Sequence, residues 1–321
     1  MSENVLFRTP VETPPSRHPI QPHDGCVLLG SCFAQEMAKR MSEYKMDVIC
    51  NPLGTLYNPA SINLLVHKAL HHEEEEEALP TFEQQGQWHC WLAGTQVSGH
   101  TEDNLRNTVN LKLGELKEAL LRASHLIITL GTNVCYRLKE DESVVANCHK
   151  MPARLFAEDA LPPGLCMDIL MNMTEELLAS NPNLHITFTV SPYRYAKYGL
   201  HRSQLAKATL LLAVDEVCSK VEQADYFPAY EILTDELRDY RFYADDMLHP
   251  SSVAVDFIWK RFCQTHLSEH TRCYLEEYDP IRKGLSHKPL NPNSTQHKAF
   301  LLTLAEKDKR LREKYGMKVV T

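Results

Sequence analysis

The sequence predicts a three-layer α/β fold around a central parallel sheet of about five strands. Short, almost continuous apolar segments alternate along the chain with longer segments that have a helical spacing of apolar residues. Continuous apolar strands are typical of a parallel sheet covered on both faces, and right-handed crossovers bring the carboxyl ends of such strands to one edge. The expected strands are residues 26–29, 47–50, 126–130, 185–190 and 226–228, and the expected helices are residues 33–43, 59–71, 103–123, 166–180 and 202–223.

Length and composition predict one large globular domain. The chain has 321 residues, of which 43% are hydrophobic, and no Pro/Gly/Ser-rich linker divides its middle. We expect a single domain over residues 1–321, with an insertion around residues 72–101 and a C-terminal helical extension over residues 268–321.

The insertion and the extension each have a predicted structure. The glutamate run at residues 73–77 is expected to be solvated, and the segments on both sides of Gly86 are expected to form a hairpin. Residues 294–316 have a near-helical spacing of apolar residues after a capping Ser294 or Thr295. This pattern predicts an amphipathic helix packed on the domain, with a partner-binding helix as the alternative.

Charge and hydropathy argue against several classes of partner. The net charge of −8, without a basic cluster that contains aromatic residues, argues against a nucleic-acid partner. No apolar run is long enough to span a membrane, and residues 1–19 lack the apolar core of a secretory signal. We therefore expect no membrane partner and a cytoplasmic location, while the oligomeric state stays open.

Cysteine and histidine usage predicts neither disulfides nor a metal. The ten cysteines include no CxxC pair and are interpreted as buried free thiols. The adjacent pairs His71-His72, His89-Cys90 and Cys148-His149 lack the spacing of a zinc site. We expect no metal and no cofactor. The cysteines taken as typical of this pattern are Cys26, Cys50, Cys135 and Cys218.

Polar residues and glycines follow the predicted strands at the edge where their carboxyl ends meet. Ser31 follows the first strand directly, so its backbone N–H lies at a helix N-terminus, where a developing negative charge is stabilised. Gly54 follows the second strand and Asn133 the third, and they can supply a second backbone N–H and a side-chain amide. Ser31, Gly54 and Asn133 therefore form a candidate oxyanion hole.

The loop after the fifth strand supplies a candidate base. His249 can take the proton of Ser31, and Asp246, three residues earlier, can accept a hydrogen bond from the other ring nitrogen. Asp245 competes with Asp246 for this role, but the spacing to His249 favours Asp246. The predicted catalytic residues are therefore Ser31, Asp246 and His249.

Several of these residues also have an ordinary structural interpretation. Ser31 can be the cap of the first helix, Gly54 a turn glycine and Asn133 a helix cap. Cys32 can be the nucleophile of a Cys–His pair, because a helix N-terminus lowers the pKa of a thiol. We favour Ser31, because Cys32 is expected to turn toward the sheet as packing.

Arg194 and Tyr243 are candidate substrate-binding residues. Together with Tyr240 and Arg241 they can bind an anionic or sugar group at the rim of a pocket. Pairing of an arginine with a nearby acid of the segment DELRDYR is the more ordinary interpretation.

Five sequence blocks resemble the GSCFA family: GSCFA at residues 30–34, NPLGTLYNPASI, IITLGTNVCYRL, TVSPYRY and YFPAYEILTDELRDYRFYADDMLHPSS. The family resembles the SGNH, or GDSL-like, hydrolases, and this resemblance implies a flavodoxin-like α/β/α fold. The usual GDSL block is replaced by GSCF, and Gly131-Thr132-Asn133 lacks the aspartate that usually follows the asparagine. The resemblance implies that the roles above fall to Ser31, Gly54, Asn133, Asp246 and His249.

Together these residues predict a serine hydrolase that acts on an acyl ester, as an esterase or a carbohydrate O-acyl deacetylase. The expected substrate is a small-molecule or carbohydrate acyl ester. An O-acyltransferase with the same triad is an alternative, because both reactions need the same acyl-enzyme. The alternative from a different class is a non-catalytic ligand-binding or scaffold protein on the same fold.

Overall fold

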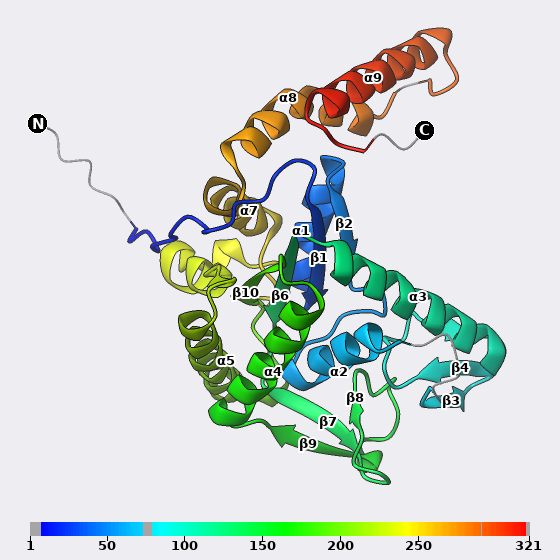
Figure 1. The fold of residues 1–321 in the computed structure, drawn as a ribbon, viewed down its shortest axis with the longest axis vertical. Helices are drawn as coiled ribbons and strands as arrows, with labels where there is room; N and C mark the ends of the chain where they lie inside the picture. Colours follow the sequence, from blue (N-terminus) through cyan, green and yellow to red (C-terminus); the bar gives the residue numbers. More distant parts are fainter. Residues whose placement is uncertain (1–7, 73–78, 290, 319–321) are drawn as a thin grey trace, which may run out of the picture.

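The central sheet has five strands, and it lies in the middle of the molecule (Figure 1). The computed structural model describes residues 8–72, 79–289 and 291–318. The strands lie in the order β11-β10-β6-β1-β2, which is a flavodoxin-like order, and the predicted fold class is confirmed. The strands are β1 (Gly25–Gly30), β2 (Asp47–Cys50), β6 (His125–Leu130), β10 (His185–Val190) and β11 (Ala224–Tyr226).

All four pairings in this sheet are parallel, so the carboxyl ends of the strands share one edge. β1 lies inside the sheet, and its Leu28 is opposite Cys50 on one side and Ile127 on the other. The fifth strand lies at residues 224–226 rather than at the predicted 226–228. Pro228 has no N–H group with which to extend the strand pairing.

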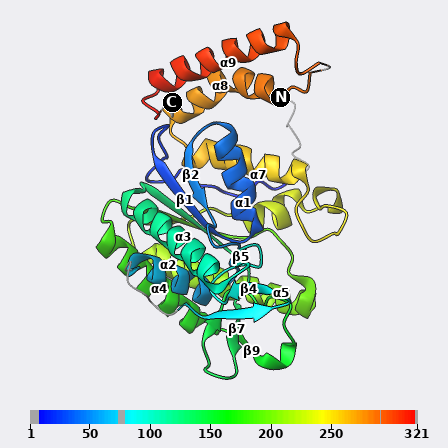
Figure 2. The same cartoon turned by 90° about the vertical axis from the view of Figure 1, so that its right-hand side faces the viewer.

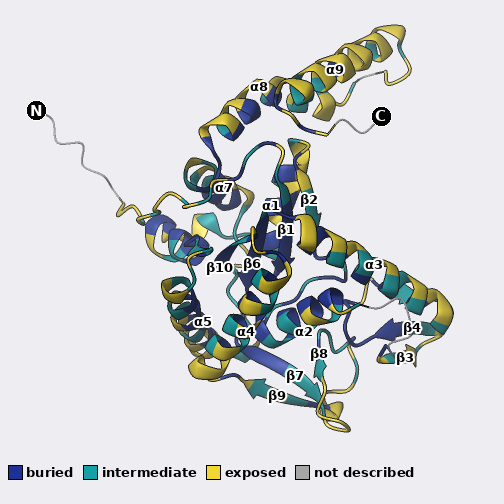
Figure 3. Ribbon diagram, viewed as in Figure 1, coloured by how far each residue is buried: buried dark blue, intermediate teal, exposed yellow. Residues whose placement is uncertain are grey.

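Helices cover both faces of the sheet (Figure 2). Because side chains alternate along a strand, Val27 and Leu29 of β1 belong to one core and Cys26 and Leu28 to the other. Figure 3 shows the strands buried between helices whose outer sides are exposed. The first core contains α2 (Pro59–Leu70), α3 (Glu102–Arg122), α4 (Pro163–Ser180) and α5 (Leu200–Lys220), and the second contains α1 (Cys32–Glu43) and α7 (Ser252–His266).

Two small antiparallel sheets extend the domain. The predicted hairpin around Gly86 is present, and Gln85 and Gly86 both have positive φ, as a tight two-residue turn requires. The glutamate run at residues 73–77 lies outside the described residues. The second sheet follows β6 and was not predicted. The strands are β3 (Thr81–Gln84), β4 (Gln87–Cys90) and β5 (Ser98–Gly99) in the first sheet, and β7 (Val134–Leu138), β8 (Val144–Val145) and β9 (Phe156–Ala160) in the second.

The C-terminal segment forms a pair of helices, α8 (Glu269–Ser286) and α9 (Thr295–Lys314), at one end of the molecule (Figure 1). The predicted cap is Ser294, whose side chain accepts the N–H of His297 at 3.2 Å. The predicted amphipathic helix packs on α8, where Tyr278 donates to Asp308 at 2.7 Å. The predicted domain limits stay a prediction.

The ten cysteines are free thiols, but the prediction that they are buried holds for only four of them, and Cys273 is exposed. Cys26 and Cys135 are buried, whereas Cys50 and Cys218 are only partly buried. Within the described residues, no helix combines the length and apolar character needed to cross a membrane. Short helical segments complete the fold at Ala153–Leu155, Ala196–Tyr198, Ala229–Glu231, Ile232–Leu237 and Tyr240–Phe242.

Candidate active site

The turn from β1 into α1 is held by backbone geometry that only glycine tolerates. Gly30 has a φ of +125°, and a Cβ there would lie 2.1 Å from the carbonyl oxygen of Thr129. The side chain of Asn51 fixes the same peptide groups: its Oδ1 accepts the N–H of Gly30 at 2.8 Å and its Nδ2 donates to the Gly30 oxygen at 3.0 Å. The residues that follow Gly30 are therefore rigidly placed at the carboxyl edge.

Ser31 is the N-cap of α1. Its Oγ accepts the N–H of Phe33 at 3.3 Å, and its own N–H donates to the oxygen of Thr129 at 3.0 Å. The residue is only 2% exposed. This is the capping role that the sequence left open for Ser31, and its function as a nucleophile stays a prediction.

Cys32, the first residue of α1, lines a cavity of about 250 Å³ together with Tyr193 and His249. Residues of α1 and α7 complete the walls of this cavity, whereas Ser31 is not among the lining residues. The expectation that Cys32 turns toward the sheet is therefore wrong. The strand-to-helix turn therefore places Cys32, and not the capping Ser31, among the residues around the space beside the candidate base.

Asp246 and His249 form the pair that their spacing predicts. His249 Nδ1 lies 2.5 Å from Asp246 Oδ2, and the N–H groups of Leu248 and His249 both donate to Asp246 Oδ1 at 2.9 Å. The hydrogen bonds from His249 and Leu248 lower the pKa of Asp246 to about 2, so the carboxylate is charged at neutral pH. An ionised Asp246 places the proton of neutral His249 on Nδ1 and leaves Nε2 as the proton acceptor.

The three predicted oxyanion donors have protein acceptors in this structure. In addition to the Ser31 N–H, the N–H of Gly54 donates to the oxygen of Asn51 at 2.9 Å. Asn133 Nδ2 donates to the oxygen of Leu161 at 2.7 Å, and a side-chain amide has a second N–H. The predicted oxyanion hole therefore stays a prediction.

Arg194 supports the loop that carries the Asp246–His249 pair. Its backbone N–H donates to the oxygen of Leu248 at 3.0 Å, and its guanidinium donates to the oxygen of Met247 at 3.3 Å. The guanidinium also lies 5.3 Å from the ring centre of Tyr243. The predicted substrate-binding role of Arg194 and Tyr243 stays a prediction. Arg241 pairs with the nearby Asp239 at 3.0 Å, as the ordinary interpretation of this segment predicts.

Sequence reasoning missed Lys207, a lysine of α5 that is only 1% exposed. Its Nζ donates to the oxygens of Gly131 and Ser191, both at 2.7 Å, and so joins the ends of β6 and β10. Burial lowers the pKa of Lys207 to about 7. Helical spacing offered a signal, because Ser203 and Leu210 place position 207 on the buried face of α5.

Sequence reasoning also missed the role of Tyr193, whose ring centre lies 4.3 Å from that of His249. Its backbone N–H donates to Ser191 Oγ at 3.3 Å, which places the ring after β10. The sequence carries no signal for this contact, since it joins two loops that are distant along the chain. Tyr193 restricts the position of the His249 ring by packing, whereas Asp246 holds the same ring by a hydrogen bond.

One group of side chains has the composition of a metal site. His67 Nδ1 and His71 Nε2 lie 2.8 Å and 2.7 Å from the same Glu176 oxygen. Among the described residues, these are the only three His, Cys, Asp or Glu residues whose possible metal-binding atoms all lie within 4.8 Å of one another. It lies on α2 and α4, and none of its members lines the cavity beside Cys32. The expectation of no metal stays a prediction.

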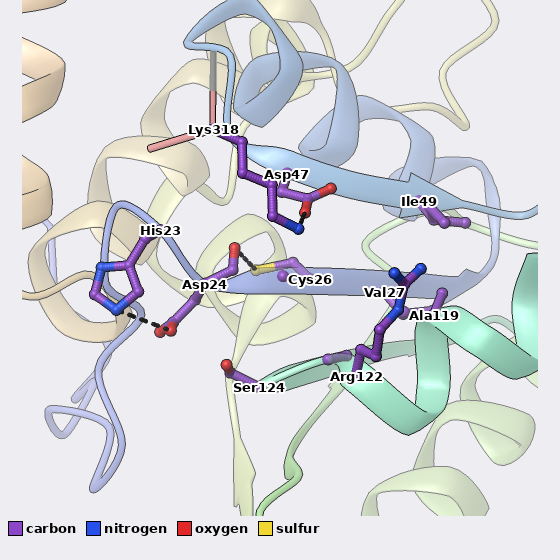
Figure 4. Close-up of a pocket in the computed structure, with 12 residues that line it drawn as sticks. His23, Asp24, Cys26, Val27, Asp47, Ile49, Ala119, Arg122, Ser124 and Lys318 are labelled. Carbon is purple, nitrogen blue, oxygen red and sulfur yellow. Dashed lines mark hydrogen bonds and ion pairs between the residues drawn. The ribbon is translucent and has the colours of Figure 1, made fainter. Parts of the chain in front are cut away.

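A second hollow, of about 190 Å³, lies at the amino end of β1 (Figure 4). Lys318 and Asp47 approach each other there at 3.8 Å, and His23 lies 4.0 Å from Asp24. None of the predicted site residues lines it. The predicted chemistry therefore belongs to the opposite edge of the sheet.

The sequence model of the GSCFA family matches residues 26–262, which include most of β1, the Asp246–His249 loop and most of α7. The chain belongs to the GSCFA family. A second model, described as the C-terminal domain of GSCFA domain proteins, matches residues 278–318 in α8 and α9. No curated protein matches this GSCFA protein.

Two solved structures are similar to this GSCFA protein at low identity. One is described as a candidate platelet activating factor from Streptococcus pneumonia, with 13% identity, a TM-score of 0.41, and coverage of 75% of this chain and 83% of that chain. The other is an acetyl xylan esterase from the rumen bacterium Butyrivibrio proteoclasticus, with 11% identity, a TM-score of 0.40, and coverage of 77% and 64%. At these TM-scores neither likeness carries an argument about the site.

Proposed function

We propose that this GSCFA protein is a hydrolase of small acyl esters. The observation that carries the proposal is the hydrogen bond of 2.5 Å between His249 and the ionised Asp246, at a cavity beside the turn from β1 into α1. A histidine oriented in this way can take a proton from a nucleophile and return it to a leaving group. The turn provides two candidate nucleophiles, Ser31 and Cys32.

The reaction consists of two transfers of an acyl group. In the first, His249 Nε2 accepts the proton of the nucleophile, which attacks the ester carbonyl, and the protonated ring then gives this proton to the departing alkoxide. In the second, His249 activates a water molecule that hydrolyses the acyl-enzyme. Asp246 stabilises the imidazolium that forms in both steps.

The size of the cavity supports a short acyl group. Its volume of about 250 Å³ is at or below the lower end of the roughly 300–1,000 Å³ that is usual for sites of drug-sized ligands. Acetyl esters, including acetylated sugars whose larger part stays outside the cavity, therefore fit better than long-chain esters.

The test is hydrolysis of p-nitrophenyl esters from acetate to octanoate, and release of acetate from acetylated sugars, by wild type, Asp246→Asn and Asp245→Asn. Asp245 is a matched control, because it is the neighbouring acid and His249 bonds to Asp246 instead. We expect hydrolysis that is fastest for acetate and falls about 100-fold or more in Asp246→Asn, but not in Asp245→Asn. Equal activity of the two variants, or no hydrolysis by wild type, would contradict the proposal.

A further inference from the structure

We infer that Cys32 is the nucleophile of this site, and that the acyl-enzyme is a thioester. This inference rests on the proposed ester hydrolysis and departs from the nucleophile that the sequence favours. It follows from three features of the β1–α1 turn: which side chain is accessible, which is already bonded, and which charges surround the thiol.

Access distinguishes the two neighbouring residues. Ser31 is 2% exposed, and its Oγ is used by the N–H of Phe33, so attack by this hydroxyl would break the cap of α1. Cys32 is partly exposed and lines the same cavity as His249. Attack by Cys32 leaves Ser31 Oγ in place as the cap of α1.

The surroundings of Cys32 make it dependent on a base. Burial raises the pKa of the Cys32 thiol, and the negative charge of Glu36 also raises it. The N–H groups of Cys32 and Phe33 and, least of all, the charge of Lys207 act in the opposite direction. The thiol is therefore protonated at neutral pH and becomes a nucleophile when His249 accepts its proton. A cysteine that is already ionised needs no base to attack. Cys32 does need one, so His249 removes its proton as it would remove the proton of a serine.

Lys207 carries a positive charge below its pKa of about 7, and its amine cannot turn away to solvent because the residue is buried. Its Nζ is held by the oxygens of Gly131 and Ser191, and its charge acts on the Cys32 thiol. A cation in this position stabilises negative charge on sulfur, both when Cys32 attacks and when it leaves. Lys207 is a positioning and electrostatic residue, because it touches neither the ester nor the reacting atoms.

The reaction balances without a further reactant. The Cys32 proton passes to His249 Nε2, an S–C bond to the acyl carbon forms, the ester C–O bond breaks, and the alkoxide takes the proton from His249. In the second half, water gives a proton to His249, a C–O bond forms, the C–S bond breaks, and the thiolate takes this proton. The sum is ester plus water to acid plus alcohol.

The first experiment traps the acyl-enzyme. Wild type, Cys32→Ala, Ser31→Ala and Cys273→Ala are treated with p-nitrophenyl acetate, quenched in acid, and analysed by intact mass and peptide mapping. Cys273 is the matched control, because it is an exposed cysteine outside the site. We expect an acetyl group on Cys32 that neutral hydroxylamine removes, as it does from a thioester, and that is absent only in Cys32→Ala. An acetyl group on Ser31, or hydrolysis that survives in Cys32→Ala, overturns the inference but not the proposed function.

The second experiment does not depend on ester hydrolysis. The rate of alkylation by iodoacetamide is measured at Cys32 and at Cys273 in wild type and in His249→Ala, with circular dichroism as the test of folding. We expect alkylation of Cys32 to slow at least about tenfold in His249→Ala, while that of Cys273 does not change. If wild type hydrolyses no ester but this difference is present, the proposed function fails and the activated thiol remains. If both cysteines react alike in the two proteins, the inference is overturned.

Discussion

The two edges of the sheet each carry a histidine paired with an aspartate, in opposite surroundings. At the carboxyl edge the His249 and Asp246 side chains are 47% and 44% exposed, and their nearest atoms are 2.5 Å apart. At the amino edge the His125 and Asp24 side chains are 6% and 13% exposed, and their nearest atoms are 3.2 Å apart. The same two residue types therefore form a half-exposed pair at one edge and a mostly buried pair at the other.

The amino edge gathers further histidines that are kept neutral. His185 lies between His18, with ring centres 3.5 Å apart, and His125, with ring centres 5.7 Å apart. Burial lowers the pKa of both His185 and His266 to about 4. The comparison teaches that a His–Asp pair is a candidate for catalysis only where a cavity adjoins it, as at His249, and that the pKa of a buried histidine such as His266 is lowered by its surroundings.

The largest expected effect is on kcat. It is tested by substituting one histidine at each edge of the sheet. In His249→Gln, we expect kcat for acetyl ester hydrolysis to fall by about 100-fold to 10,000-fold, because the base is lost, with little change in the midpoint of thermal unfolding. In His125→Gln, we expect the opposite result: a lower midpoint and an unchanged kcat per folded molecule. Kinetics and a thermal melt on both variants test this, and equal losses of activity would remove the distinction.

The next largest expected effect is a fall in the free energy of unfolding at lower pH, caused by the buried histidines at the amino edge. His266 binds a proton more weakly in the folded protein, with a pKa of about 4, than in the unfolded chain, with a pKa of about 6.5. Between these values the unfolded state holds more protons, so stability is lost as pH falls. We expect the free energy of unfolding to drop by about 2 kcal/mol for such a group between pH 7 and pH 5, measured by urea denaturation.

Two variants locate the source of this pH dependence. His266→Leu should reduce it, whereas His249→Gln should not, because His249 is half exposed at the other edge. A free energy of unfolding that is the same at pH 7 and pH 5 in wild type would contradict the buried, neutral state of the histidines.

The smallest expected effect compares a capping serine at each edge. Ser31 caps α1 at the carboxyl edge, and Ser268 caps α8 near the amino edge, where its Oγ accepts the N–H of Thr271 at 3.0 Å. Ser31→Ala and Ser268→Ala should each cost about 1 kcal/mol of unfolding free energy. Urea denaturation at pH 7 measures both, with the corresponding Ser→Asp variants as controls that keep a cap. A cost near zero for Ser31→Ala would mean that this hydroxyl does not cap the helix.

Much of the fold could be predicted from local pattern. The apolar strands at residues 47–50 and 185–190 match β2 and β10, and the other predicted strands and helices of the central domain lie within a few residues of their predicted positions. Helix α7 was not predicted. Strand and helix periods are set by near neighbours, which explains this agreement. The second small sheet was missed because its β7–β9 pairing joins segments about 20 residues apart that carry no strong alternation.

The sequence by itself determined the α/β fold, the place of the site at the carboxyl edge, and the Asp246–His249 pair, because each depends on spacing along the chain. Tertiary structure alone decided which of the adjacent Ser31 and Cys32 lines the cavity, and that Lys207 is held between the ends of two strands. Neighbouring residues at a turn meet different surroundings, and those surroundings come from distant parts of the chain. The N–H of Ser31, for example, donates to the oxygen of Thr129 in β6. The bond between Lys207 of α5 and Gly131, which are separated by 76 residues, likewise joins distant segments.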